Sequence, residues 1–319
     1  MTGVLRIGTR GSKLAVAQTR QAADRIAELS GRDVEIVTVT THGDVNRASL
    51  KELGGRGVFA TELRDALREG EVDIAVHSLK DLPTAGAPGL VLAAHPTRED
   101  ARDALVARDG LTLAELPAGA RVGTGSPRRV AQLRRVRGDL DIRDIRGNID
   151  TRIGFVTSGE LDAVVLATAG LSRYERTGYI TERFDLAEFP NSPGQGALAI
   201  EVREGFELDA LSELDDPATR LAVEAERAVL AGLDAGCQAP VGAHAEVVDG
   251  VLRLHAVVYD DRDPVNVRVM EASGEAPAPA TRLPLGPAEA RPVATGAGAE
   301  LAARLVDDLF AAGAGALTL

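Results

Sequence analysis

Apolar and polar residues follow two periods along this chain, and the alternation between those periods predicts the order of its secondary structure. Short apolar or alternating runs are typical of strands, and they occur at residues 4–9, 34–39, 72–76, 90–94, 103–107, 121–124, 141–145, 162–167 and 197–202. Apolar residues at helical spacing follow several of these runs, for example across residues 14–29, a helix for which Ser12 is a good N-cap. Strands that alternate with helices favour an α/β fold with parallel pairing.

The pattern changes twice, and these changes divide the chain into three predicted domains. A charged segment with a proline, residues 96–102, marks the crossover from a first domain to a second, and the strand at 197–202 returns to the first. A third unit begins near Pro217. Its elements are a helix, three strands and a closing helix, predicted at residues 218–233, 243–248, 252–258, 265–272 and 301–310. The predicted domains are therefore residues 1–96 with 197–215, residues 97–196, and residues 216–319.

Polar residues follow directly after the buried strand predicted at residues 72–76. His77, Ser78, Lys80 and Asp81 come within five residues of its end, and Pro83 prevents a central strand from continuing. Ligands bind at the carboxyl ends of strands in open α/β sheets. The chain has 36 Lys and Arg together, of which only three are Lys, so a Lys beside an Asp here indicates a site that needs a compact charge. The simpler alternative is an ordinary strand exit with solvated charges.

Several arginines repeat this placement. Six of them lie at or just past the carboxyl ends of predicted strands: Arg10, Arg128, Arg129, Arg146, Arg152 and Arg173. Arginine pairs bidentately with carboxylate or phosphate, so the group indicates a polyanionic ligand. No Walker or dinucleotide glycine pattern is present, which favours carboxylates. The alternatives are a loop-capping role for Arg10 and, because Ser126 and Pro127 predict a helix start, a surface helix for Arg128 and Arg129.

Composition and charge narrow the class of protein. The chain has 319 residues, a formal net charge of −12, 3% aromatic residues and one cysteine. The negative charge and the scarcity of aromatic residues argue against a nucleic-acid partner. No signal-peptide pattern and no stretch of eighteen apolar residues is seen, so we expect a cytoplasmic protein with no membrane partner. A single cysteine excludes an internal disulfide and a cysteine-based metal cluster, and we expect no metal.

Two loops draw attention by their composition. Residues 41–57 are polar and glycine-rich, and a connection of this length is expected to be functional or mobile. Cys237, the single thiol, lies in a Gly-Cys-Gln turn rather than in an apolar run. A lone cysteine is more often a small core residue, whereas its place in a loop favours a reactive or attached thiol.

Eight motifs, in order and at family-like spacing, carry a resemblance that runs nearly end to end. They read IGTRGSKLA, GGRGVFATEL, HSLKDLPT, VGTGSPRR, IRGNIDTR, LATAGLSR, PGQGALAIE and GCQAP. The chain resembles the porphobilinogen deaminase, or hydroxymethylbilane synthase, family of tetrapyrrole (haem) biosynthesis. The resemblance implies two periplasmic-binding-protein-like domains with a hinged cleft, plus a small C-terminal α/β domain with an antiparallel three-stranded sheet.

The resemblance also implies an activity and a cofactor. A dipyrromethane cofactor would be attached to Cys237 by a thioether bond. Four porphobilinogen molecules would be added to it stepwise with release of ammonia, and water would then release hydroxymethylbilane. The family expectation is a monomer whose partners are porphobilinogen and the growing linear oligopyrrole.

Site residues follow from the same resemblance. Asp81 would be the catalytic carboxylate. The cofactor- and substrate-binding residues would be Arg10, Ser12, Ser78, Lys80, Thr124, Ser126, Arg128, Arg129, Arg146, Gly147, Asn148, Arg152, Arg173 and Gln195. A mobile loop would contain Lys51, Arg56 and Phe59. The chain departs from the family where Glu52 replaces a common lysine, and Lys51 could substitute for it.

Two other classes of function compete with this hypothesis. A non-catalytic module with the same hinged fold could capture anions, although no signal peptide or helix-turn-helix pattern accompanies it. Residues 128–137, rich in arginine, could form a nucleic-acid-binding arm, which the net charge of −12 disfavours.

Overall fold

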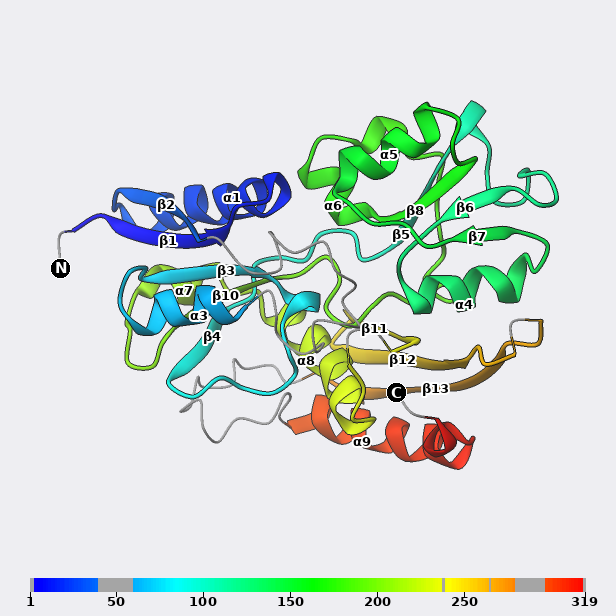
Figure 1. Cartoon of the computed structure of the whole chain (residues 1–319). Coiled ribbons are helices and arrows are strands. Elements are labelled where there is room, and N and C mark those ends of the chain that lie inside the picture. Colours follow the sequence, from blue (N-terminus) through cyan, green and yellow to red (C-terminus); the bar gives the residue numbers. More distant parts are fainter. Residues whose placement is uncertain (1–2, 40–59, 237–238, 264, 279–295, 318–319) are drawn as a thin grey trace.

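A computed structural model describes the chain except for residues 1–2, 40–59, 237–238, 264, 279–295 and 318–319. The described residues form three sheets, each with its own helices and core (Figure 1). The mixed α/β class and the C-terminal three-stranded antiparallel sheet are confirmed.

The first sheet has the strand order β2-β1-β3-β10-β4. β1 is parallel to both neighbours, whereas β10 runs antiparallel to β3 and β4. Its strands are β1 (Leu5–Arg10), β2 (Val34–Val39), β3 (Ile74–Ser78), β4 (Leu90–Ala94) and β10 (Leu198–Arg203). Helices α1 (Lys13–Ser30) and α7 (Asp209–Leu214) pack on one face, and α3 (Thr61–Arg68) packs on the other.

The second sheet has the order β7-β6-β8-β5-β9. Its strands are β5 (Asp103–Ala107), β6 (Arg121–Gly123), β7 (Asp141–Arg143), β8 (Ala163–Ala167) and β9 (Glu182–Arg183). Helix α4 (Pro127–Val136) covers one face through Leu133, and α5 (Ile149–Thr157) covers the other through Ile153 and Val156. A short helix, α6 (Thr168–Arg173), follows β8 directly.

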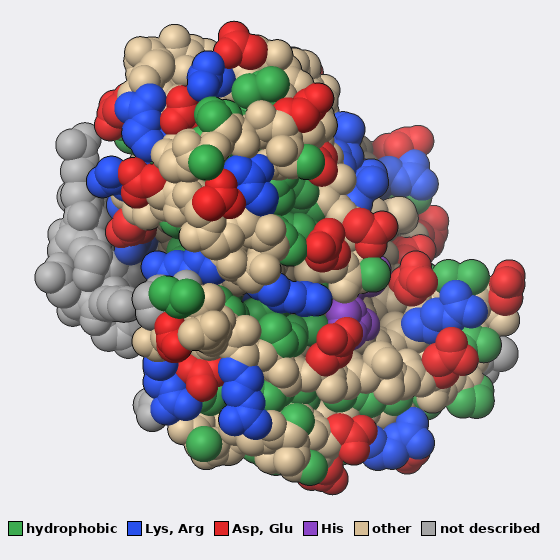
Figure 2. Space-filling model, turned by 90° about the vertical axis from the view of Figure 1, so that its right-hand side faces the viewer, with side chains coloured by type: hydrophobic (Ala, Val, Ile, Leu, Met, Phe, Trp, Pro, Cys, Tyr) green, Lys and Arg blue, Asp and Glu red, His purple; other side chains and the backbone are tan. Residues whose placement is uncertain are grey.

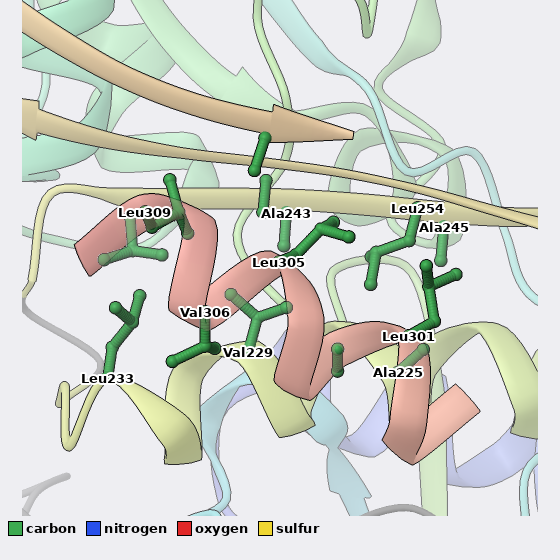
Figure 3. Close-up of a cluster of buried hydrophobic side chains, with 14 of the residues drawn as sticks. Ala225, Val229, Leu233, Ala243, Ala245, Leu254, Leu301, Leu305, Val306 and Leu309 are labelled. Carbon is green, nitrogen blue, oxygen red and sulfur yellow. The ribbon is translucent and has the colours of Figure 1, made fainter. Parts of the chain in front are cut away.

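The third sheet is a meander of β11 (Val241–Val248), β12 (Val251–Asp260) and β13 (Arg268–Pro277). Helices α8 (Pro217–Gly232) and α9 (Gly296–Ala311) pack on it and on each other. Figure 3 shows Leu301, Leu305 and Leu309 of α9 among side chains of α8 and the strands. This apolar layer is the largest hydrophobic cluster among the described residues, and its burial stabilises the third unit.

Most predicted elements are present, with shifted ends. The strand predicted at 72–76 is found at Ile74–Ser78, so His77 is a buried strand residue and does not follow the strand as predicted. The run of apolar residues begins at Val72, which lies in the connection before the strand, so the strand was predicted too early. The last strand, predicted at 265–272, runs from Arg268 to Pro277. Elements as short as α6, α7 and β9 have too few residues to show a period, and they were not predicted.

Two chain segments link the first two sheets, and both contact α8. Glu226, fully buried, accepts hydrogen bonds from the Arg98 guanidinium at 2.7 and 2.9 Å and from the Gly194 amide at 2.7 Å. The segments cross at Gly196, whose φ is +87° and whose added Cβ would lie 2.4 Å from the Glu99 carbonyl oxygen. Only glycine fits such a crossing. The domain boundaries given above stay predictions.

The described residues contain no helix that is long and apolar enough to cross a membrane. They also contain no group of three or more His, Cys, Asp or Glu residues arranged to hold a metal ion. Acidic and basic side chains are interspersed on the face of the molecule in Figure 2.

Candidate functional site

Asp81 is held at the carboxyl edge of the first sheet by a single turn of 3₁₀ helix, η1 (Leu79–Asp81). The turn is anchored because Leu79 is fully buried and its amide donates to the Ala197 carbonyl of the neighbouring segment at 3.1 Å. Ser78, at the end of β3, donates its hydroxyl to Gln18 Oε1 of α1 at 2.9 Å. The Asp81 carboxylate is exposed and forms no side-chain hydrogen bond or ion pair with another described residue. It is therefore available to a ligand.

Lys80, beside it, points toward the second sheet. Its Nζ donates to Gln195 Oε1 at 3.4 Å. The pKa of the Lys80 ammonium is lowered to about 8, mainly by burial and also by the charges of Arg129 and Arg128, while Asp81 and Asp103 act in the opposite direction. The ammonium therefore lies near two other cations, Arg128 and Arg129, and a bound carboxylate would stabilise its charged form.

Arg128 and Arg129, on the first turn of α4, turn inward and share one buried carboxylate. Arg128 Nη2 lies 2.8 Å from Asp103 Oδ2, and Arg129 Nη2 lies 2.6 Å from Asp103 Oδ1. Gln195 Nε2 donates to the same Asp103 oxygen at 2.8 Å. The three charged side chains are at most 8% exposed. The surface-helix alternative for these arginines is therefore wrong, and with Lys80 the group keeps a net positive charge.

Arg152 and Arg173 form no close ion pair with another described residue, although the charges of Asp144 and Glu99 respectively raise their pKa values. Arg152 Nε donates to the Gly147 carbonyl at 2.9 Å, and Arg173 Nη2 donates to the Gly196 carbonyl at 2.7 Å. Burial, followed by the charges of Arg129 and Arg146, lowers the pKa of Arg152 to about 10. Burial also lowers the pKa of Arg173. Half-buried guanidinium groups of this kind are stabilised by an anion.

The remaining predicted residues lie around this cluster in different roles. Arg10 ends β1 and lines a small cavity of about 30 Å³ with His77, Ser78 and Asp81. Ser12 and Asn148 cap α1 and α5 by accepting from the Ala15 and Thr151 amides. Thr124 is buried and accepts from the Ser126 amide at 3.3 Å.

Two predictions need qualification. Ser126 occupies the N-cap position of α4, but its side chain makes no capping hydrogen bond. Arg146 is exposed and lies 3.8 Å from Asp144, so its guanidinium reaches solvent near Arg152 and not the Asp103 cluster. Lys51, Arg56, Phe59 and Cys237 lie outside the described residues.

One cavity is lined both by the turn that carries Asp81 and by residues on either side of positions 237–238. It has a volume of about 300 Å³, and its lining includes Lys80, Asp81 and Arg227. Gly236 and Ala239, the described residues on either side of positions 237–238, line it as well. The described residues on either side of positions 237–238 therefore lie at the cavity that Asp81 also lines. The cavity and the two cations that line it, Lys80 and Arg227, fit a polycarboxylate such as a dipyrromethane.

Sequence reasoning missed Asp103, Glu226 and Arg227. Asp103 begins a strand that reads as ordinary core, and no local pattern connects it with arginines 25 residues away. Glu226 and Arg227 lie inside an amphipathic helix, where charged residues normally face solvent. The available signal was that these two charged residues stand among the apolar residues Ala225 and Val229, which predict the buried side of the helix.

The rival hypothesis of a nucleic-acid-binding arm loses its support here. Arg128 and Arg129 are buried, Arg137 pairs with Asp139 at 2.7 Å, and Arg134 lies 3.7 Å from Asp261. These arginines do not form a free basic face.

We expect Asp103→Asn to lower the free energy of unfolding at pH 7 by about 3–5 kcal/mol, because it leaves buried arginines without their carboxylate. The two guanidinium groups hold the pKa of Asp103 well below its usual range despite its burial. The charged form therefore stabilises the fold at neutral pH, and this stabilisation is lost as the pH falls below about 4. Urea unfolding should show the wild type and the variant converging toward acid.

A matched control is Asp139→Asn, which removes an exposed carboxylate from an Arg pair in the same region. It should change stability little. Equal effects of the two substitutions would contradict the structural importance of Asp103.

The fold and the site define an α/β protein that gathers cations from two sheets, an arrangement suited to a polyanionic ligand. Comparison with known proteins gives this class a family. Residues 5–209 match the family model described as the porphobilinogen deaminase dipyrromethane cofactor binding domain, and residues 220–288 match the porphobilinogen deaminase C-terminal domain. The chain belongs to the porphobilinogen deaminase family, as the motifs predict.

Curated relatives carry the same name. The porphobilinogen deaminase of Leifsonia xyli is 63% identical over 263 residues, covering 81% of this chain and 80% of that protein. Porphobilinogen deaminase 1 of Streptomyces coelicolor is 56% identical over 265 residues, covering 80% of this chain and 83% of that protein. Among solved structures, the methionine-binding protein MetQ overlaps 66% of this chain and 87% of its own at 14% identity, with a TM-score of 0.42. A TM-score this low carries no argument about the site.

Proposed function

We propose that this chain is a transferase that joins four porphobilinogen molecules, one at a time, to a dipyrromethane primer on Cys237 and then releases hydroxymethylbilane by hydrolysis. One observation carries the proposal: an exposed carboxylate, Asp81, shares a cavity with the residues that flank position 237 and with two cationic side chains, Lys80 and Arg227. The family and the curated relatives support the same reaction.

Asp81 acts on the pyrrole that reacts. In each addition the C–N bond of porphobilinogen breaks, ammonia leaves with the bonding electrons, and an electron-poor azafulvene-type cation remains. The free α-carbon of the acceptor ring then forms a C–C bond and loses its proton. A carboxylate near the ring N–H stabilises the cation and accepts protons as the bond forms. The dipyrromethane, when bound, supplies the first free α-carbon.

The cationic residues hold the substrate carboxylates. Each porphobilinogen brings two carboxylates, and a protein of net charge −12 would repel a lengthening polyanion without a local cationic lining. Lys80, Arg152 and Arg173 have the least compensated charges of the described cluster. Arg128 and Arg129 are paired by Asp103, so they add positive potential while fixing the shape of the site.

We expect Arg152→Met to raise the KM for porphobilinogen or to stall elongation, with little change in folding. Loss of one charge-assisted hydrogen bond to a carboxylate is worth about 1.5–3 kcal/mol, or roughly tenfold to a hundredfold in binding. Arg176→Met is the matched control, because Arg176 lies in the same domain but pairs with Asp150 outside the cluster. Steady-state kinetics and thermal melting of both variants make the comparison. Unchanged kinetics in Arg152→Met would remove this residue from the site.

The direct test of the activity is to supply purified protein with porphobilinogen. The proposal requires ammonia and hydroxymethylbilane in a ratio of four to one. Binding of porphobilinogen without release of ammonia would favour the non-catalytic binding module instead.

The cellular setting and the assembly state follow from the function. A biosynthetic enzyme that uses a small soluble substrate is expected in the cytoplasm. We propose a monomer, which is what the resemblance of the motifs implies. We also keep the proposed domains of residues 1–96 with 197–215, residues 97–196, and residues 216–319. Sedimentation of the purified protein would test the monomer.

A further inference from the structure

Arg227, on helix α8 of the third unit, reaches across to the turn that carries Asp81. Its Nη1 donates to the carbonyls of Leu79 and Leu82 at 3.3 and 3.0 Å, and its Nη2 donates to the carbonyl of Pro83 at 2.6 Å. The three carbonyls bracket Lys80 and Asp81 on both sides along the chain. One side chain therefore fixes the backbone before and after the catalytic carboxylate.

The charge of Arg227 is unusual in its surroundings. The residue is 6% exposed, and it forms no ion pair with any residue in the described part of the chain. Burial, followed by the charge of Arg64, lowers its pKa to about 10, while Glu224 and Glu201 act in the opposite direction. A buried guanidinium without a carboxylate is costly. Hydrogen bonds from its planar guanidinium offset this cost only when the acceptors lie at fixed positions. The backbone of residues 79–83, which supplies the acceptors, must therefore hold one conformation.

Helix α8 connects this contact with two other parts of the molecule. The preceding residue, Glu226, binds both segments that link the first two sheets, through Arg98 and Gly194. The helix ends at Gly232, and Gly236, four residues later, lines the same cavity as Arg227 and Asp81. The helix thus relates the position of Asp81 to the segment that leads into position 237.

We propose that Arg227 is a positioning residue for Asp81: it fixes the η1 turn to helix α8, so that the carboxylate keeps one position through every addition. The inference rests on the proposed function for its catalytic consequence. Its structural content, the clamping of residues 79–83 by α8, can be measured without any activity.

The test compares Arg227→Met and Arg227→Lys with Arg220→Met. Arg220 is a matched control because it lies on the same helix and also crosses to the first domain. It donates to the Ala93 carbonyl at 3.1 Å and pairs with Asp215, away from Asp81. All proteins are prepared with their cofactor, which is checked by intact mass, and are compared with the wild type by thermal melting.

We expect Arg227→Met to retain the cofactor and the KM for porphobilinogen and to lose kcat by about tenfold to a hundredfold, since a catalytic group misplaced by about 1 Å can cost a hundredfold. Arg227→Lys, which keeps a donor and the charge, should recover part of the loss. Arg220→Met should keep wild-type kcat even if it melts at a lower temperature. Hydrogen–deuterium exchange of the peptide containing residues 79–83 should accelerate in Arg227→Met only.

Three outcomes would overturn the inference. The first is equal loss of kcat in Arg227→Met and Arg220→Met, which would indicate general destabilisation. The second is a raised KM with unchanged kcat, which would make Arg227 a substrate-binding group. The third is unchanged exchange at residues 79–83. If the wild type itself releases no ammonia, the proposed function fails, while the exchange experiment still decides whether Arg227 clamps the turn.

Discussion

Asp81→Asn should lower the rate of porphobilinogen condensation by on the order of a thousandfold. The substitution keeps the shape of the side chain and removes its charge. A carboxylate about 4 Å from a developing pyrrolic cation contributes about 4 kcal/mol at an effective dielectric constant near 20. Since about 1.4 kcal/mol is a tenfold change in rate, its loss accounts for about three orders of magnitude. The exposed position of Asp81, without a competing partner among the described residues, leaves this charge free to act on a ligand.

Asp81→Glu is the matched comparison, because it keeps the charge and misplaces it by one methylene. It should retain more activity than Asp81→Asn. Pre-steady-state turnover of both variants, each checked by thermal melting, provides the measurement. An Asn variant as active as the Glu variant would mean that Asp81 only positions the ring, and the electrostatic mechanism would be wrong.

Cys237→Ser should give a folded protein that lacks the cofactor and makes no product. Cys237 is the single thiol of the chain, and its described neighbours Gly236 and Ala239 line the cavity shared with Asp81. A serine hydroxyl is a far weaker nucleophile than a thiolate, so no thioether-like attachment replaces it. Intact mass, melting temperature and product formation report the three expectations separately.

The control for this variant restores a thiol elsewhere. Ala218 is exposed at the start of α8, so Cys237→Ser combined with Ala218→Cys carries one thiol far from the cavity. It should remain without cofactor and inactive. Cofactor or product in either protein would show that Cys237 is not the attachment site.

Much of the fold was predictable because its strands and longer helices are read by periodicity. The strand at residues 103–107 was predicted with its observed bounds, and Ser12 was recognised as a helix cap from its side chain alone. Because ligands bind at the carboxyl ends of strands in open α/β sheets, the sequence also indicated Asp81 and Lys80. The structure places Lys80 beside Arg128, Arg129 and Asp103. Local chemistry and topology were sufficient for these features.

The rest of the site depends on contacts between distant parts of the chain. Arg227 binds carbonyls about 145 residues earlier in the sequence, and Arg98 meets Glu226 after 128 residues. No local pattern specifies either contact. The pairing of Arg128 and Arg129 with Asp103 is likewise a contact that no local pattern specifies, and their role in binding a ligand stays a prediction. The number of cations at the sheet edge therefore predicted a positive charge for the site, but not which of these cations pair with a carboxylate of the protein.

The most direct test of the account is the intact mass of the protein before and after brief exposure to limiting porphobilinogen. The account predicts a purified chain heavier than its sequence by two linked pyrrole units. After exposure it predicts a ladder of covalent additions, each equal to one porphobilinogen less one ammonia, that ends at four. A chain whose mass equals that of its sequence and stays unchanged while it turns over or binds porphobilinogen would contradict the claim that growth occurs on a primer attached to Cys237.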